Sequence, residues 1–102
     1  MGWDIDSIDV SPSEPIKAGE PFVILYAATN NGSTEEPPHT DHIEMWRSDG
    51  VKPVDEWKTS ATSPAGDGYS ILVDVPGQDA GYYDIKVTLH DGTGLGRSLR
   101  IE

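Results

Sequence analysis

The chain has 102 residues, enough for one domain with one modest hydrophobic core. Its 18 acidic and 7 basic residues give a net charge of −11, which repels nucleic acid and anionic membrane surfaces. It contains no cysteine, which excludes a disulfide, a thiolate metal site and a cysteine nucleophile.

The N-terminus carries no targeting pattern. Residues 1–4 lack the basic region and the apolar core of a signal peptide. We expect residues 1–2 to be an added start, with the segment cut from a longer protein, and residues 3–102 to form a single domain. No apolar run approaches the roughly 20 residues of a membrane-spanning helix, so no membrane insertion is expected.

The first strand is expected at Trp3–Val10. Its apolar residues alternate, slip by one position near Asp6-Ser7 and resume at Ile8. A β-bulge or a switch between sheets would absorb this slip. Residues 11–15 contain two prolines, which lack the amide donor of a sheet ladder, so we expect a loop or an edge segment there.

A run that is apolar on both faces follows at Phe22–Thr29. Such a run fits either a central strand covered on both sides or a short helix. Pro21 before it, its β-branched content and the Asn31-Gly32 turn signal after it favour the strand. The polar residues 33–40 are then expected to form a loop.

Apolar and polar residues alternate without a break from Tyr83 to Leu89. This period of two predicts a strand with one face in the core and one face in water. Four more strands are expected in the second half of the chain, at His42–Arg47, at Pro53–Thr59 along an edge, at Tyr69–Val75 and at Leu95–Ile101. A loop is expected at 60–68 and a hairpin turn at 90–94. Seven strands without a convincing helix predict an all-β, seven-stranded antiparallel β-sandwich.

The core of this sandwich is expected to collect the inward-facing apolar residues of each strand. These are Ile5, Ile8, Phe22 or Ile24, Tyr26, Trp46, Ile71, Val73, Tyr83, Ile85, Val87, Leu89, Leu99 and Ile101.

The segment Asp79-Ala80-Gly81-x-Tyr83-x-Ile85 resembles the D-x-G-x-Y-x-C signature of immunoglobulin-like domains, with Ile85 in the cysteine position. The resemblance implies an immunoglobulin-like sandwich without a disulfide. It also implies a tyrosine corner, in which the Tyr83 hydroxyl bonds back to the preceding loop. Trp46 would take the part of the core tryptophan.

Two alternatives remain open within this resemblance. Ile43 or Met45 could be the inward residue in place of Trp46, because His42–Arg47 alternates poorly. Packing of Ile24 or Tyr26 against Ile85 would replace the disulfide between the sheets.

The N-terminal part is similar to the CARDB-type domains of bacteria and archaea, which are adhesion-related immunoglobulin-like modules. The similarity lies in residues 4–12 with their Ser-Pro loop, in Ala18-Gly19-Glu20-Pro21 and in residues 29–32. The resemblance implies a non-catalytic module of a larger extracellular protein, either a spacer or a binding unit.

Metal-capable side chains gather at His39, Asp41, His42 and Glu44. On a strand His42 and Glu44 share a face, whereas His39 and Asp41 are expected nearer the loop. Zinc needs three or four converging ligands with a supported outer shell, which one stretch seldom supplies alone. We therefore expect exposed polar residues here and no metal site.

Two groups of acids offer oxygen ligands for Ca²⁺. They are Asp4 and Asp6 with Asp9, and separately Asp91 in the turn Asp91-Gly92-Thr93-Gly94. Neither has the spacing of an EF-hand loop. Solvated acids are the expected outcome, with calcium binding as the alternative and no cofactor otherwise.

The aromatic residues are the best indication of a ligand. Trp3, Trp46, Trp57 and Tyr82 exceed what the core clearly needs. Carbohydrate-binding sandwiches place flat aromatic faces against sugar rings, so these four are the candidate ligand-binding residues. Packing in the core and at its rim is the alternative.

The sequence contains no G-x-S-x-G, H-E-x-x-H or P-loop motif, so we do not expect an enzyme. The first hypothesis is a non-catalytic structural or adhesive module of a larger extracellular or cell-surface protein. The alternative is a carbohydrate-binding accessory domain of a secreted enzyme. The expected partners are neighbouring domains of the parent protein and a glycan or protein ligand, with no nucleic acid, and the isolated chain is expected to be monomeric.

Overall fold

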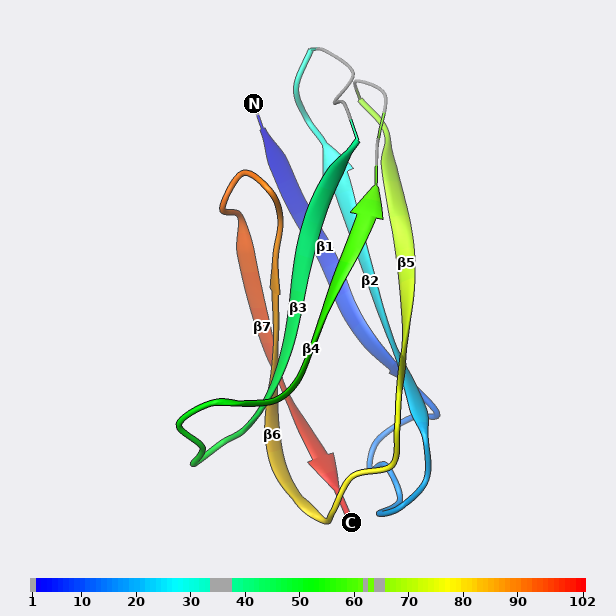
Figure 1. Ribbon diagram of the computed structural model, residues 1–102. Helices are drawn as coiled ribbons and strands as arrows, with labels where there is room; N and C mark the ends of the chain where they lie inside the picture. The colour runs from blue at the N-terminus through cyan, green and yellow to red at the C-terminus, as the bar shows by residue number, and fades with distance from the viewer. Residues whose placement is uncertain (1, 34–37, 62, 64–65) are drawn as a thin grey trace.

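The computed structural model describes residues 2–33, 38–61, 63 and 66–102. Within these residues the regular structure consists of seven strands (Figure 1). The strands are β1 (Trp3–Ser11), β2 (Phe22–Asn30), β3 (His39–Arg47), β4 (Pro53–Ala61), β5 (Gly68–Val75), β6 (Gly81–Thr88) and β7 (Gly94–Ile101). The described part of the chain holds no helix that could cross a membrane.

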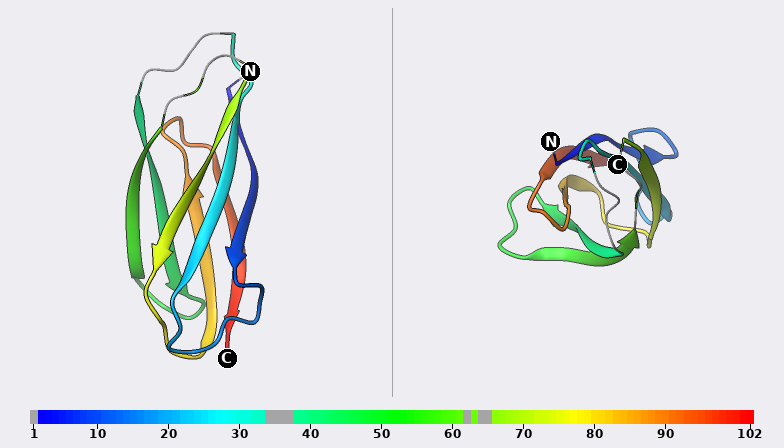
Figure 2. Two further views of the ribbon diagram at one scale, coloured as in Figure 1. Left: turned by 90° about the vertical axis from the view of Figure 1, so that its right-hand side faces the viewer. Right: turned by 90° about the horizontal axis from the view of Figure 1, so that it is seen from above.

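The strands form two sheets that face each other as two layers (Figure 2). One sheet has the order β1-β2-β5 and the other has the order β4-β3-β6-β7. Every strand pair within them is antiparallel. The predicted seven-stranded antiparallel β-sandwich is therefore confirmed, and the absence of cysteine means that no disulfide joins its layers.

The slip in the pattern of β1 is a β-bulge. The register with β2 shifts between Ile5 and Ser7, so that Trp3 and Ile8 are both buried although they are five positions apart. After β1 the chain crosses to the other sheet, where Ile16 pairs in parallel with Ile101 at the end of β7. The Ile16 amide donates to the Arg100 carbonyl at 3.1 Å, and the Glu102 amide donates to the Ile16 carbonyl at 2.8 Å.

The segment Phe22–Thr29 is a central strand, as its two apolar faces predicted. β2 lies between β1 and β5, and its residues alternate between buried and half-buried positions. Ile24 and Tyr26 are completely buried. The predicted alternation of β6 is also confirmed, because Tyr83, Ile85 and Val87 are buried while Lys86 is exposed.

Strand β3 corrects one prediction about the core. Its buried residues are Asp41, Ile43 and Met45, whereas Trp46 is half-buried and lies on the opposite, outer face. Successive residues of a strand point to opposite faces, so a buried Met45 excludes an inward Trp46. The alternative with Ile43 and Met45 inward holds, and Trp46 is not the core tryptophan.

Some predicted boundaries move. β3 already begins at His39, β4 continues to Ala61 and β5 begins at Gly68, so the loops predicted at 33–40 and 60–68 are shorter than expected. Residues 34–37, 62, 64 and 65 of these two loops lie outside the described residues.

The observed core contains most of the predicted residues. Ile5 and Ile71 are half-buried against it, and both Phe22 and Ile24 belong to it. The core also contains Ile43 and Met45, the alternatives to Trp46, and four buried apolar residues that were not predicted: Trp3, Ile16, Ala28 and Val75.

The two ends of the described chain lie at opposite poles of the sandwich. Figures 1 and 2 show the start of β1 at one pole and the end of β7 at the other. The molecule measures 43 × 27 × 17 Å along its principal axes, so the poles are separated along its longest dimension.

Candidate functional site

A cluster of polar and aromatic side chains fills the interior at the pole where β1 begins. We call it the Asp41 cluster, and it comprises Trp3, Tyr26, His39, Asp41, Thr59, Tyr69 and His90. The antiparallel topology brings these residues together, because β1, β3 and β5 begin at this pole and β6 ends there (Figure 1).

Asp41 is completely buried at the centre of this cluster. Its Oδ2 atom accepts a hydrogen bond from the Tyr26 hydroxyl at 2.8 Å and another from the Tyr69 hydroxyl at 2.5 Å. The Tyr26 hydroxyl also bonds the Thr59 hydroxyl at 2.7 Å. Because Tyr26 and Tyr69 belong to the other sheet, the carboxylate of Asp41 joins the two layers.

The second carboxylate oxygen of Asp41 has a different environment. Oδ1 lies 3.5 Å from Nε2 of His39, as an ion pair would place it. Among the described residues this buried oxygen accepts no hydrogen bond. A buried polar oxygen without a donor is costly, and a hydrogen-bond donor or a cation beside Oδ1 would offset this cost.

Two histidines, His39 and His90, lie near Oδ1 of Asp41. The ring of His39 stacks on the ring of His90 with centroids 3.7 Å apart and an angle of 25° between the planes. The ring of Trp3 meets the two imidazoles edge-on, at 5.4 Å and 5.6 Å. One ring nitrogen from each histidine and one oxygen of Asp41 all lie within 4.8 Å of one another.

Burial raises the pKa of Tyr26, against a smaller lowering by the hydrogen bond with Thr59. Burial also raises the pKa of Tyr69, and the hydrogen bond to Asp41 raises it further. Both hydroxyls therefore remain protonated and available to donate to the carboxylate.

The metal-capable residues His39, Asp41, His42 and Glu44 lie on two opposite faces of β3. His39 and Asp41 point into the cluster, whereas His42 is exposed and Glu44 half-buried on the outer face. The expectation of exposed polar residues is therefore wrong for Asp41. The alternation with the buried Ile43 places Asp41 inward, a signal that is present in the sequence. His90 was missed because it is distant in sequence and becomes a neighbour only through the β3–β6 pairing.

The four candidate ligand-binding aromatics do not share one surface. Trp3 is buried in the Asp41 cluster, and Trp57 packs against the core opposite Ile43. Trp46 and Tyr82 do share the outer face of the four-stranded sheet, since Trp46 pairs with Asp84 and Tyr82 lies two residues before it.

We call the surface around Trp46 and Tyr82 the outer aromatic face. The ammonium group of Lys86 lies 4.6 Å from the centroid of the Trp46 ring, a cation–π contact. The guanidinium of Arg100 lies 5.9 Å from the centroid of the Tyr82 ring. Tyr82 is 65% exposed and offers most of its surface to solvent.

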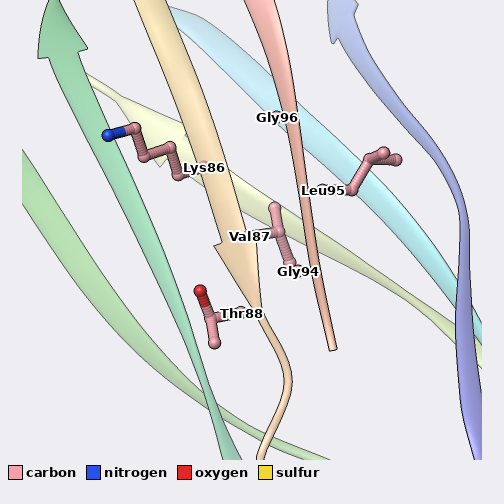
Figure 3. A pocket seen from close by; sticks show the side chains of 6 residues that line it. All are labelled: Lys86, Val87, Thr88, Gly94, Leu95 and Gly96. Atoms are coloured by element: carbon pink, nitrogen blue, oxygen red, sulfur yellow. The ribbon is translucent and has the colours of Figure 1, made fainter. Parts of the chain in front are cut away.

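A shallow depression borders this face between β6 and β7 (Figure 3). Gly94 and Gly96 stand opposite Thr88 and Lys86 in the register and add no side chains there. Figure 3 shows Lys86 extending toward β3, in agreement with its contact with Trp46. The depression is open to solvent and has few polar groups, so it offers little to recognise a small molecule.

The acids proposed for calcium have other partners. Asp4 accepts a hydrogen bond from the Asn31 amide and Asp6 accepts one from the Thr29 hydroxyl, both at 2.5 Å. Asp91 accepts a hydrogen bond from the backbone amide of Thr93 at 2.9 Å, within the β6–β7 turn. Burial raises the pKa of Asp91, but the hydrogen bonds from Thr93 and the other polar groups around it together lower the pKa below its ordinary value. Within the described residues these acids do not belong to a group of three convergent metal ligands.

The tyrosine corner is present. The Tyr83 hydroxyl donates to the backbone carbonyl of Asp79 at 2.7 Å. It also accepts a hydrogen bond from the Arg47 guanidinium at 3.0 Å, while that guanidinium lies 5.2 Å from the centre of the Tyr83 ring. The corner therefore fastens the loop before β6 to the end of β3.

Comparison with known proteins identifies the fold alone. No protein-family model matches the chain, and no curated protein matches it in sequence. The chain is similar in structure to part of a Pseudomonas fluorescens alkylpurine DNA glycosylase, AlkC, bound to DNA containing an abasic site analog, with a TM-score of 0.74 and 16% identity. It is also similar to part of a Bifidobacterium adolescentis GH3 β-glucosidase, with a TM-score of 0.63 and 15% identity.

The share of each chain that is covered differs greatly in these comparisons. The first alignment covers 98% of this chain and 30% of the glycosylase, and the second covers 95% of this chain and 17% of the glucosidase. The chain thus spans less than a third of each of these structures. The same sandwich occurs in both as a minor part of a larger enzyme.

Proposed function

We propose that the chain is a non-catalytic structural or adhesive module of a larger extracellular or cell-surface protein. The observation that carries this proposal is the position of the two ends at opposite poles of a sandwich 43 Å long. A module with this geometry joins one neighbour at each pole and spaces them apart. Its partners are then the domains that precede and follow it.

Two further observations support this role. The fold occupies a minor share of the two larger enzymes that resemble it, as a module does. The Tyr83–Asp79 hydrogen bond supports the finer assignment to the immunoglobulin-like, CARDB-type modules, because this corner is a recurrent feature of immunoglobulin-like strands.

Immunolabelling of intact cells tests the location. An antibody raised against the 102-residue chain is applied to intact and to permeabilised cells of the source organism, with an antibody against a cytosolic enzyme as the control. We expect labelling of intact cells by the first antibody only. Labelling that needs permeabilisation for both antibodies would contradict an extracellular module.

The second candidate function is carbohydrate binding by an accessory domain of a secreted enzyme. The outer aromatic face favours it, because Trp46 and Tyr82 lie on one solvent-facing surface together with the charged residues Asp84 and Lys86. Lys86 already lies over the Trp46 ring, so a sugar would have to displace its ammonium group.

Affinity electrophoresis through gels that contain soluble polysaccharides tests this candidate. Retardation that Trp46→Ala and Tyr82→Ala abolish would support sugar binding on this face. The matched control is Trp57→Phe, which changes a half-buried tryptophan on the inner side of the neighbouring strand. Unretarded migration of the wild type over the whole panel would exclude this function.

A further inference from the structure

We propose that Asp41, His39 and His90 bind one divalent transition-metal ion of the Zn²⁺ type inside the Asp41 cluster. This inference goes beyond the module role and does not depend on it. It rests on three features: the converging ligand atoms, a buried carboxylate oxygen that accepts no hydrogen bond among the described residues, and the fixed orientation of that carboxylate.

The separation of Asp41 Oδ1 and His39 Nε2 is close to that of two ligands of one metal ion. Two atoms bound at 2.0–2.1 Å to a tetrahedral Zn²⁺ lie about 3.3 Å apart. The distance from Asp41 Oδ1 to His39 Nε2 is 3.5 Å. The same Nε2 atom makes a 3.1 Å hydrogen bond with the Tyr69 hydroxyl, which metal binding would replace. All three ligand atoms lie within 4.8 Å of one another, so His90 would complete the set after a small shift toward the ion.

His90 is able to make this shift because it lies outside the strands. It follows Leu89 in the turn between β6 and β7 and is exposed, whereas His39 and Asp41 are held in the ladder of β3. Turns accommodate small movements that a paired strand resists. Three protein ligands leave the fourth tetrahedral position to water.

The carboxylate of Asp41 is oriented as an outer shell orients a metal ligand. The hydroxyls of Tyr26 and Tyr69 both donate to Oδ2, which leaves Oδ1 for the ion. Among the described residues Oδ1 accepts no hydrogen bond, although Asp41 is completely buried. Partners that fix one oxygen of a carboxylate while the other binds a metal are a regular feature of metal sites.

The charges of the cluster also agree with a bound cation. A buried carboxylate needs a compensating positive charge. A ligand set of two imidazoles and one carboxylate suits Zn²⁺ and its first-row neighbours.

The ion would have a structural effect on the pole that holds it. It would connect β3 to the β6–β7 turn directly, and through Tyr26 and Tyr69 it would connect the two sheets. A ligand that binds only the folded chain stabilises it. Metal binding should therefore raise the melting temperature of the protein.

The test measures Zn²⁺ binding by the full 102-residue chain after treatment with a chelator. Isothermal titration calorimetry should give one ion per chain. At a free Zn²⁺ concentration of about 100 times Kd, the melting temperature should rise by at least about 10 °C. Co²⁺ should give the visible absorption bands of a low-coordinate site and should be displaced by Zn²⁺.

Three variants locate the site. His90→Ala removes an exposed turn residue and should weaken binding at least about tenfold without loss of the fold. Asp41→Asn should weaken it as well, and the His90 variant keeps the test valid if the Asp41 variant does not fold. His42→Ala is the matched control, because His42 is an exposed histidine of the same strand on its other face, and it should bind as the wild type does.

Two results would overturn the proposal. One is a wild-type chain that shows neither heat of binding nor a change in melting temperature with Zn²⁺, Co²⁺ or Ni²⁺; the cluster is then an ion pair of His39 with Asp41. The other is wild-type affinity in His90→Ala together with weakened binding in His42→Ala, which would move the ion to the outer face of β3.

Discussion

The Tyr83 hydroxyl donates a hydrogen bond to the carbonyl of Asp79, four residues earlier in the chain. Tyr83 is almost completely buried, so this bond satisfies a polar group inside the sandwich. We expect Tyr83→Phe to lower the free energy of unfolding by about 1 kcal/mol. Urea denaturation measures this change, with Tyr82→Phe, a change at an exposed position of the same strand, as the control. Equal stability of the Tyr83 variant and the wild type would argue against a stabilising corner.

A second prediction concerns the centre of the core. Ile85 is completely buried in β6, and truncation to alanine removes apolar contacts and leaves a cavity. We expect Ile85→Ala to lower the free energy of unfolding by about 2–5 kcal/mol. Leu72→Ala, at a position that is 66% exposed in β5, should change it by less than about 0.5 kcal/mol. Comparable losses in both variants would mean that Ile85 is not in a close-packed core.

A third prediction concerns the close approach of two loops at the pole where β7 ends. A Cβ atom on Gly77 would overlap the carbonyl oxygen of Gly19, a backbone atom that has little freedom to move. We therefore expect Gly77→Ala to lower the melting temperature measurably. Gly96→Ala is the control, since its Cβ would meet its nearest neighbour, the Ile85 carbonyl, at an ordinary 3.5 Å. Equal melting temperatures for the two variants would show that the loops separate readily.

A fourth prediction concerns alkaline pH. Burial and the bond to Asp41 raise the pKa of Tyr69 in the folded chain, whereas an unfolded tyrosine titrates near pH 10. The folded state therefore holds this proton more tightly. Its contribution to stability is complete below about pH 10 and is lost as the pH rises further.

Denaturation of the metal-free chain at a series of pH values measures this dependence. The free energy of unfolding should decline above about pH 10, and the decline should be less steep in Tyr69→Phe. Leu72→Ala, at an exposed position of the same strand as Tyr69, should leave the slope unchanged. A wild-type stability that is constant to about pH 11.5 would contradict the raised pKa.

Much of the fold was predictable from local pattern. β6 alternates apolar and polar residues without a break, and β2 is apolar on both faces. In both strands the pattern of apolar residues therefore indicated which side chains are buried. The prediction for β3 was less successful. The polar Asp41 occupies an inward position and the large apolar Trp46 an outward one, so the hydrophobic pattern of β3 was obscured at both ends.

The candidate site was harder to predict than the fold. His39 and Asp41 were noticed as metal-capable residues, but their third neighbour, His90, is nearly fifty positions away. The two tyrosines that hold Asp41 come from the opposite sheet. Only the antiparallel register and the packing of the layers bring such residues together, and neither leaves a periodic trace in the sequence.

The parallel pairing of the segment around Ile16 with the end of β7 has a mechanical consequence. The amide–carbonyl bonds of Ile16, Ala18 and Glu102 join an early segment of the chain to its last residues. Tension applied to the two poles would load these bonds lengthwise and all at once, instead of opening them one after another. Such a unit would resist stretching until all of these hydrogen bonds break together. A chain of such units would therefore extend in abrupt steps, one unit at a time.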